Sequence, residues 1–254
     1  MRTVRFRDPA GNVRRGEWSG HSDDEIAVRS HYGGRVTIGT ETLPPDDVTV
    51  LAPCDPSKIV CALTKESDEM VDRSAPSRPE FFLKPPSAVA SHRETIELPH
   101  GAERITSEPA VGAVISEHCT NVHAEAVEDV IAGYTCLNDL TNHAERGRER
   151  ELIRAKAFDG AAPIGPVVSR PENVRSDASI SLSVNGKSVL TTAADQLEFS
   201  IGVLIEEITR HLSLQPGDIV AAGTGDAVDS IEGGDTLTLE IDGIGRLVHD
   251  IATI

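Results

Sequence analysis

Aromatic residues and lysines are both scarce in this 254-residue chain. Phe, Trp and Tyr make up only 3% of it, so any core must be built from Val, Ile, Leu and Ala. Hydrophobic residues still reach 39%, which is enough for a sizeable core in a chain of this length. The few lysines are Lys58, Lys65, Lys84, Lys156 and Lys187.

Long apolar runs and paired cysteine motifs are also missing. No segment approaches the ~20 apolar residues that a membrane-spanning helix needs, and no apolar signal-peptide region follows the N-terminus. Cys54, Cys61, Cys119 and Cys136 show no C-x-x-C spacing. We therefore expect a cytoplasmic protein without a membrane partner, in which the cysteines serve as small buried apolar residues in a reducing compartment.

The charge balance is strongly acidic, with 41 acidic against 24 basic residues and a formal net charge of −17. Such a surface repels nucleic-acid phosphate and anionic lipid, so we expect no nucleic-acid partner. An acid-rich, lysine-poor composition suits a halophilic proteome, in which salt screens self-repulsion. An ordinary acidic cytoplasmic protein remains the alternative.

The pattern of apolar residues and turns indicates a mainly β protein of two parts. Short alternating segments separated by Gly and Asp-Pro turns predict a small β domain over residues 1–52. A larger domain is expected over residues 53–254, with flanking helices that make the fold class α+β. Its predicted strands cover residues 59–63, 81–83, 111–115, 134–139, 219–222, 236–241 and 248–251.

Three helices and one hairpin are expected in the larger domain. Helical spacing of apolar residues favours helices over residues 123–132 and 200–212, and a charge-rich segment suggests a third over 143–154. Gly133 is expected to end the first of these helices. Strict alternation around Asn185-Gly186 predicts a hairpin with a type I′ turn over residues 179–190. The polar residues 64–80 are expected to form a mobile loop, or a short helix with a loop.

Eight short strings in a fixed order resemble the fumarylacetoacetate hydrolase-like family. They span most of the larger domain, and their order makes a chance match improbable. In chain order they read PSKIVC, FFLKPPS, AGYT with the ND that follows, RAKAFD, APIGP, VNG, LQPGDIVAAGTG and IDGIG.

The resemblance implies a fold and a chemistry. The fold is an asymmetric β-roll or barrel with flanking helices, commonly a homodimer. Members act on small 2-oxo or 1,3-diketo acids as hydrolases or lyases, by C–C hydrolysis, dehydration, decarboxylation or isomerisation. They use a divalent metal, Mg²⁺ or Mn²⁺, which prefers oxygen ligands and stabilises an enolate as a Lewis acid.

The family holds its metal with three carboxylates, and this chain matches two. Glu108 corresponds to the first glutamate of a Glu-x-Glu pair and Asp139 to the acid that follows about 30 residues later, so both are expected metal ligands. Ala110 occupies the second glutamate position. Metal affinity should therefore fall unless water, Glu117 or Asp159 compensates.

The catalytic loop departs from the family pattern as well. Members carry a His–Glu pair there as general acid and base, whereas this chain places Glu69 and Asp72 at those positions. Two neighbouring acids still move a proton when one raises the pKa of the other, so both are expected catalytic residues. A solvated acidic face is the simpler interpretation of the same residues.

Two elements of the family's substrate site are retained. Lys156 is expected to bind an anionic substrate and to take part in catalysis. The turn of Gly223, Thr224 and Gly225 is expected to bind a substrate carboxylate oxygen through its amides and hydroxyl. Lys84 is expected to have a structural or loop-anchoring role.

Two functions follow from these matches and departures. The first is a metal-dependent enzyme acting on a small anionic 2-oxo acid through an altered site, with Glu69 as the proton carrier. The second is a pseudoenzyme that keeps the fold and serves as a binding or partner subunit, with an active paralogue as a candidate partner. Retention of Asp139 and Lys156 favours the first, and the change at Ala110 favours the second.

Overall fold

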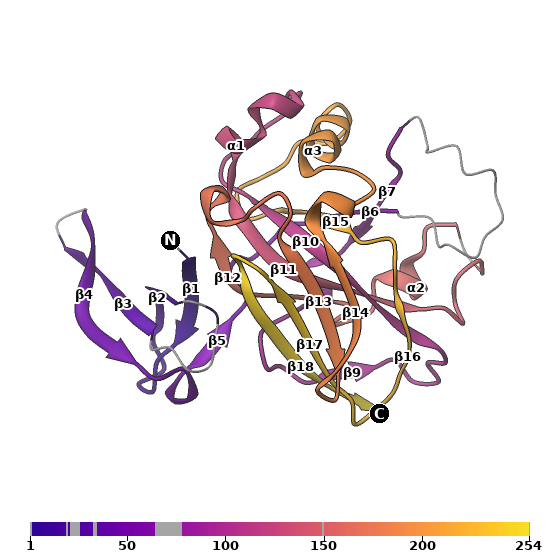
Figure 1. The fold of residues 1–254 in the computed structure, drawn as a ribbon, viewed down its shortest axis with the longest axis horizontal. Helices are drawn as coiled ribbons and strands as arrows, with labels where there is room; N and C mark the ends of the chain where they lie inside the picture. Colours follow the sequence, from indigo (N-terminus) through magenta and orange to yellow (C-terminus); the bar gives the residue numbers. More distant parts are fainter. Residues whose placement is uncertain are drawn as a thin grey trace.

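The computed structural model describes residues 2–18, 20, 26–32, 35–63, 78–148 and 150–253. These residues form a thirteen-stranded sheet and a five-stranded sheet with few helices around them (Figure 1), which agrees with the predicted fold class. The smaller sheet packs against the central strands of the larger one. Within the described residues, no helix combines the length and apolar character that a bilayer crossing needs.

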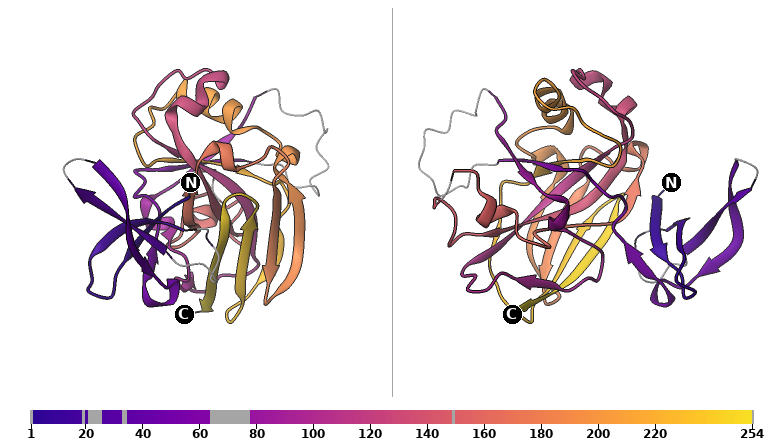
Figure 2. Two further views of the ribbon diagram at one scale, coloured as in Figure 1. Left: turned by 60° about the vertical axis from the view of Figure 1, so that its left-hand side comes forward. Right: turned by 180° about the vertical axis from the view of Figure 1, so that it is seen from behind.

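The N-terminal part forms an antiparallel unit that stands to one side of the main body (Figure 2). Val4 and Phe6 alternate with half-buried or exposed positions and are themselves fully buried, which ties the unit to a core. Its first strand also pairs with a central strand of the body, so one sheet runs through both parts. A domain boundary after residue 52 therefore stays a prediction. The strands are β1 (Arg2–Arg7), β2 (Val13–Glu17), β3 (Ile26–Tyr32), β4 (Arg35–Leu43) and β5 (Thr49–Leu51).

The rest of the large sheet follows the order β12-β11-β10-β15-β6-β7. All eleven residues of β10 are buried, because the strand is covered on both faces. These strands, with the short strands that pair at the margins, are β6 (Ile59–Ala62), β7 (Phe81–Lys84), β8 (Val89–Ala90), β10 (Ile105–Ile115), β11 (Ile131–Asn142), β12 (Ala162–Ser169), β15 (Ile219–Gly223) and β16 (Val228–Ile231).

The smaller sheet contains the predicted hairpin. Asn185 and Gly186 have φ angles of 52° and 77°, which both central residues of a type I′ turn require. Leu182 and Leu239 face the larger sheet and are fully buried. Its strands, in spatial order, are β14 (Lys187–Ala193), β13 (Ser179–Val184), β17 (Thr236–Ile241), β18 (Gly245–Thr253) and β9 (Ile96–Leu98).

The predicted helix near residue 200 is confirmed as α3 (Ile201–Thr209). Ser200 caps it by accepting a hydrogen bond from the Val203 amide, and Leu204, Ile205 and Ile208 are fully buried. The helix packs against β15 and beside α1 at one end of the sheet (Figure 1).

Two predicted helices are largely wrong. Over residues 123–132 the chain forms one 3₁₀ turn (Ala124–Ala126) and a single turn of helix, α1 (Val127–Val130), before β11 begins. Gly133 does not end a helix: it lies inside β11 at φ 145°, where a Cβ would come within 2.1 Å of the Ser169 carbonyl oxygen. The glycine thus permits close approach of β11 and β12.

The described residues of the charge-rich segment 143–154 form mostly turns and bends, and among them only the start of α2 (Ile153–Lys156) is helical. A polar segment without an apolar face has no surface to bury, so packing gives it no reason to be a helix. The cysteine prediction is confirmed as far as burial goes: Cys61, Cys119 and Cys136 are buried unpaired thiols, and Cys54 is half-buried.

Candidate active site

Two carboxylates meet where β10 and β11 run side by side. Glu108 lies directly opposite Asp139 in the antiparallel register, and both side chains are buried. Residues paired in this way have Cβ atoms about 5 Å apart. The predicted convergence of positions 108 and 139 is confirmed, although 31 residues separate them in the chain.

The predicted lysine joins this pair. Lys156 is the last residue of α2, and its ammonium nitrogen lies 2.5 Å from Asp139 Oδ2. The same nitrogen is 4.8 Å from the centre of the Phe82 ring, a distance that suits a cation–π contact. Lys156 is only 6% exposed, so solvent screens its charge weakly.

A second lysine, Lys84, completes the cluster. From the sequence we expected it to have only a structural or loop-anchoring role. Its ammonium lies 2.8 Å from Asp139 Oδ1 and donates to the carbonyl groups of Leu140, Lys156 and Ala161. The side chain is fully buried. Phe82 and Lys84 occupy alternate positions of β7 and both face inward. This period of two is the signal by which the sequence could have placed Lys84 in the site.

Charge pairing controls the protonation of this cluster. Burial alone raises the pKa of Asp139, but the ammonium groups of Lys156 and Lys84 outweigh it and hold that pKa below its ordinary value. Burial likewise opposes the charged form of Lys156, yet Asp139 and Glu108 raise its pKa above the ordinary value. Asp139 is therefore a carboxylate and Lys156 an ammonium at neutral pH.

Lys84 is subject to the same opposing forces. Burial lowers its pKa against the attraction of Asp139. Three carbonyl oxygens and one carboxylate surround its nitrogen, and they favour the ammonium form because a neutral amine has fewer N–H groups to donate. We therefore treat the Asp139–Lys84–Lys156 group as one anion held between two cations.

The turn after β15 positions Glu108. The Gly225 amide donates to Glu108 Oε1 at 3.0 Å, and a Cβ on Gly223 would lie 2.2 Å from the same oxygen. The Thr224 amide donates to the Pro109 carbonyl and its hydroxyl to the Asp226 carbonyl. The prediction that this turn binds substrate stays untested, and these donors already have partners within the protein.

The described residues do not form the three-carboxylate metal site that the family resemblance implies. They contain no group of three or more His, Cys, Asp or Glu side chains placed to hold a metal ion. Position 110 contributes a buried methyl group, and the proposed substitutes Glu117 and Asp159 are exposed and join no such group. Two carboxylates beside two ammonium groups carry no net charge, so they attract a dication weakly.

The loop acids cannot be placed in this arrangement. Glu69 and Asp72, the expected acid and base, lie outside the described residues, and their roles stay predictions.

Comparison with known proteins agrees with this fold. Residues 58–252 match the family described as fumarylacetoacetate (FAA) hydrolase C-terminal. An uncharacterized protein of Archaeoglobus fulgidus is 34% identical over 238 residues, covering 93% of this chain and 91% of the relative. The solved 2-hydroxyhepta-2,4-diene-1,7-dioate isomerase of Mycobacterium marinum is 29% identical with a TM-score of 0.87, covering 100% of this chain and 98% of the other.

A further solved structure of similar fold is a complex with a metal ion and a 2-oxo acid. The maleylpyruvate hydrolase of Sphingobium sp. SYK-6, in complex with manganese(II) and pyruvate, is 25% identical with a TM-score of 0.79, covering 100% of this chain and 99% of the other. Named relatives as a group include isomerases, a decarboxylase, a tautomerase and hydrolases. The chain belongs to the fumarylacetoacetate hydrolase family.

Proposed function

We propose that this protein binds a small 2-oxo acid and catalyses proton transfer at the carbon next to the keto group, as a tautomerase or isomerase. The observation that carries the proposal is the buried cluster in which Lys156, paired with Asp139, lies beside the second carboxylate, Glu108. An ammonium group with little solvent around it stabilises an enolate oxygen far better than water does.

The reaction needs one base and one cation. Glu108 takes a proton from the carbon next to the keto group. The C–H electron pair forms a new C=C bond, and the π pair of the C=O bond moves onto the oxygen to give the enolate. Lys156 stabilises that negative charge, while Asp139 holds the ammonium in place. The proton then returns either to carbon or to oxygen, so atoms and charge balance without a further reactant. Glu69 and Asp72 are the alternative proton carriers.

This chemistry fits the residues better than C–C hydrolysis does. Hydrolysis needs a water molecule activated by a base in addition to enolate stabilisation, and the loop lacks the histidine of the family's His–Glu pair. A divalent metal in this family supplies Lewis-acid stabilisation. Mg²⁺ or Mn²⁺ held by Glu108 and Asp139 stays a prediction, and our proposal assigns the enolate charge to Lys156 instead.

A second candidate is a binding subunit without turnover. The methyl group of Ala110 in place of a ligand carboxylate favours it, because that change removes part of the family's catalytic site. Such a subunit would retain 2-oxo acid binding at Lys156 and would pair with a second copy or with an active paralogue. Its signature is binding of pyruvate without any acceleration of proton transfer.

Oxaloacetate provides the test, because its enol form absorbs in the ultraviolet. We expect chelator-treated protein to accelerate loss of the enol band and Lys156→Met to abolish this acceleration. Arg154→Met is the matched control: Arg154 lies two residues earlier on α2 with its side chain 69% exposed, and we expect full activity. Equal rates for wild type and Lys156→Met would refute the proposed role of Lys156. Tight binding without acceleration would favour the binding subunit.

A further inference from the structure

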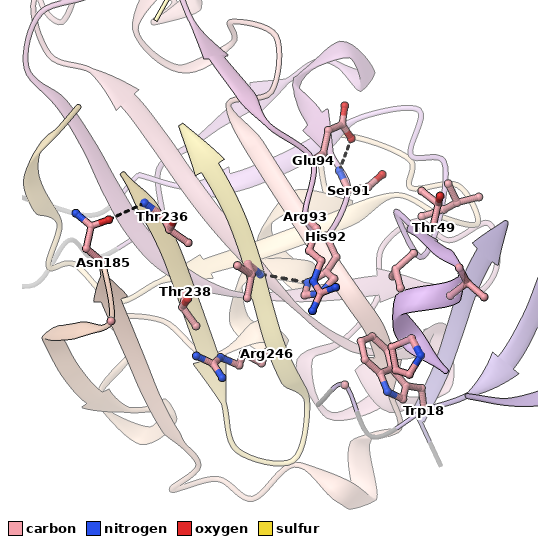
Figure 3. A pocket seen from close by; sticks show the side chains of 17 residues that line it. Trp18, Thr49, Ser91, His92, Arg93, Glu94, Asn185, Thr236, Thr238 and Arg246 are labelled. Atoms are coloured by element: carbon pink, nitrogen blue, oxygen red, sulfur yellow. Dashed lines mark hydrogen bonds between the residues drawn. The ribbon is translucent and has the colours of Figure 1, made fainter. Parts of the chain in front are cut away.

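A cavity of about 810 Å³ lies between the N-terminal unit and the outer face of the smaller sheet (Figure 3). None of Glu108, Asp139, Lys84 and Lys156 lines it. It is formed by the end of the N-terminal unit, the segment 91–94 after β8, and the outward side chains of β17 and β18. Cavities of this size at the junction of two parts of a chain commonly hold small ligands.

His92 is a buried donor at the base of this cavity. Its Nδ1 accepts a hydrogen bond from the Val248 amide at 3.2 Å, which leaves the ring proton on Nε2. Burial, helped by Arg93 and Arg246, lowers the pKa of His92 to about 4, so the ring is neutral near pH 7. The Trp18 ring packs edge-on against it with centroids 5.9 Å apart. The pair presents one N–H donor beside a flat apolar surface.

Two arginines lie close to His92 and differ in their partners. Arg93 forms an ion pair with Asp46 at 2.7 Å. It also has a φ of 61°, an uncommon conformation for a residue with a side chain, and its amide donates to the Val248 carbonyl. Within the described part of the chain, no ion pair engages Arg246. This exposed guanidinium on β18 is therefore the cation available to a ligand.

The remaining walls define the kind of ligand that fits. Val48, Val50 and Val248 supply apolar surface, and Thr238 supplies a hydroxyl. The acid of the lining, Glu94, accepts a hydrogen bond from the Ser91 amide at 2.7 Å and so is already partnered. Arg246 is near enough to His92 to lower its pKa, and its guanidinium fork binds both oxygens of a carboxylate, while the His92 ring adds one N–H donor. These two groups match a single carboxylate.

We propose that this cavity is a second binding site, separate from the Glu108–Asp139 cluster, for a small organic carboxylate with an apolar body. Arg246 and the Nε2–H of His92 bind the carboxylate, and Trp18 and the valines pack against the apolar part. The proposal is independent of the reaction at the first site.

The chain contains a single tryptophan, so Trp18 fluorescence reports directly on this cavity. The probes are benzoate, the neutral isostere benzamide, and acetate, which has the charge without the apolar body. We expect benzoate to change the emission saturably and to bind at least about tenfold more tightly than either of the others. Benzamide loses a charge-assisted contact, and acetate loses the burial of the apolar ring.

Variants locate the site. Arg246→Gln should weaken benzoate binding by about tenfold or more. Arg170→Gln, a matched change at a 54% exposed arginine that lines no part of the cavity, should leave it unchanged. Lys156→Met should also leave it unchanged, since Lys156 belongs to the other cluster. No saturable response to benzoate, equal binding of benzoate and benzamide, or wild-type affinity in Arg246→Gln would overturn the proposal. Loss of benzoate binding in Lys156→Met would also overturn it.

Discussion

Restoring a carboxylate at position 110 is the sharpest perturbation that the site offers. Ala110 lies two residues from Glu108 on the same strand and opposite Leu137, which is itself two residues from Asp139. Side chains at alternate positions share a face, and diagonal neighbours across strands are within reach of long side chains. Ala110→Glu therefore adds its carboxylate to the group formed by Glu108 and Asp139.

The expected gain in metal affinity follows from charge. The present cluster of two carboxylates and two ammonium groups is neutral, and the substitution gives it one negative charge. Unit charges 4 Å apart interact by about 4 kcal/mol at an effective dielectric constant of about 20, and a dication doubles this. Dehydrating a new carboxylate offsets several kcal/mol of that gain. We expect a net gain of about 2.8 kcal/mol, or about 100-fold in Kd.

Calorimetric titration with Mn²⁺ measures this affinity, and Ala110→Gln is the matched control because it adds the same bulk without charge. Without metal, Ala110→Glu should be less stable than Ala110→Gln by about 3 kcal/mol, since its new buried charge has no partner. Saturating Mn²⁺ should recover that loss. Equal Mn²⁺ affinities in the two variants would refute the placement of position 110 beside the two acids.

Three further outcomes follow from the contacts of the cluster. Lys84→Met should lower the free energy of urea unfolding by about 3 kcal/mol or more, because it removes one partner of a buried ion pair. Lys187→Met, at an exposed lysine, should change that free energy by less than about 0.5 kcal/mol. Equal effects of the two substitutions would contradict the buried role of Lys84. Gly223→Ala should displace the Glu108 carboxylate, which lies 2.2 Å from the added Cβ. The rate of enol loss from oxaloacetate should fall at least about tenfold, while the unfolding free energy falls by only about 1 kcal/mol. Unchanged activity would show that Glu108 is not the base. The lysines lower the pKa of Asp139, so its ion pairs stabilise the fold above the ordinary carboxyl pKa and are lost as the pH falls below it. On acidification, the unfolding free energy of the wild type should therefore fall more than that of Asp139→Asn. Parallel curves of unfolding free energy against pH would contradict the ion pairing.

Features that depend on local pattern were predictable from the sequence. The Asn185-Gly186 hairpin follows from alternation around residues that accept positive φ, and α3 follows from apolar spacing after a serine cap. The convergence of Glu108 and Asp139 was also predicted, because the family resemblance set the strand register.

Features that depend on long-range packing were not. Gly133 has the sequence context of a helix end, but the close approach of Ser169 from β12 makes it part of a strand. Alternation along β7 marks Lys84 as inward-facing, but its contact with Asp139 depends on β7 lying at one edge of the sheet while α2 reaches the same core. The His92 cavity exists only where the N-terminal unit meets the smaller sheet, so no local motif could have indicated it.

Deuterium exchange into the methyl group of pyruvate tests the proposed chemistry most directly, because exchange requires the C–H bond to break and the enolate to form. With wild-type protein in deuterated buffer and excess chelator, we predict that proton NMR shows the methyl signal decaying faster than in buffer alone, and that Lys156→Met removes this acceleration. A decay rate with wild-type protein equal to that of buffer would contradict enolate formation supported by Lys156.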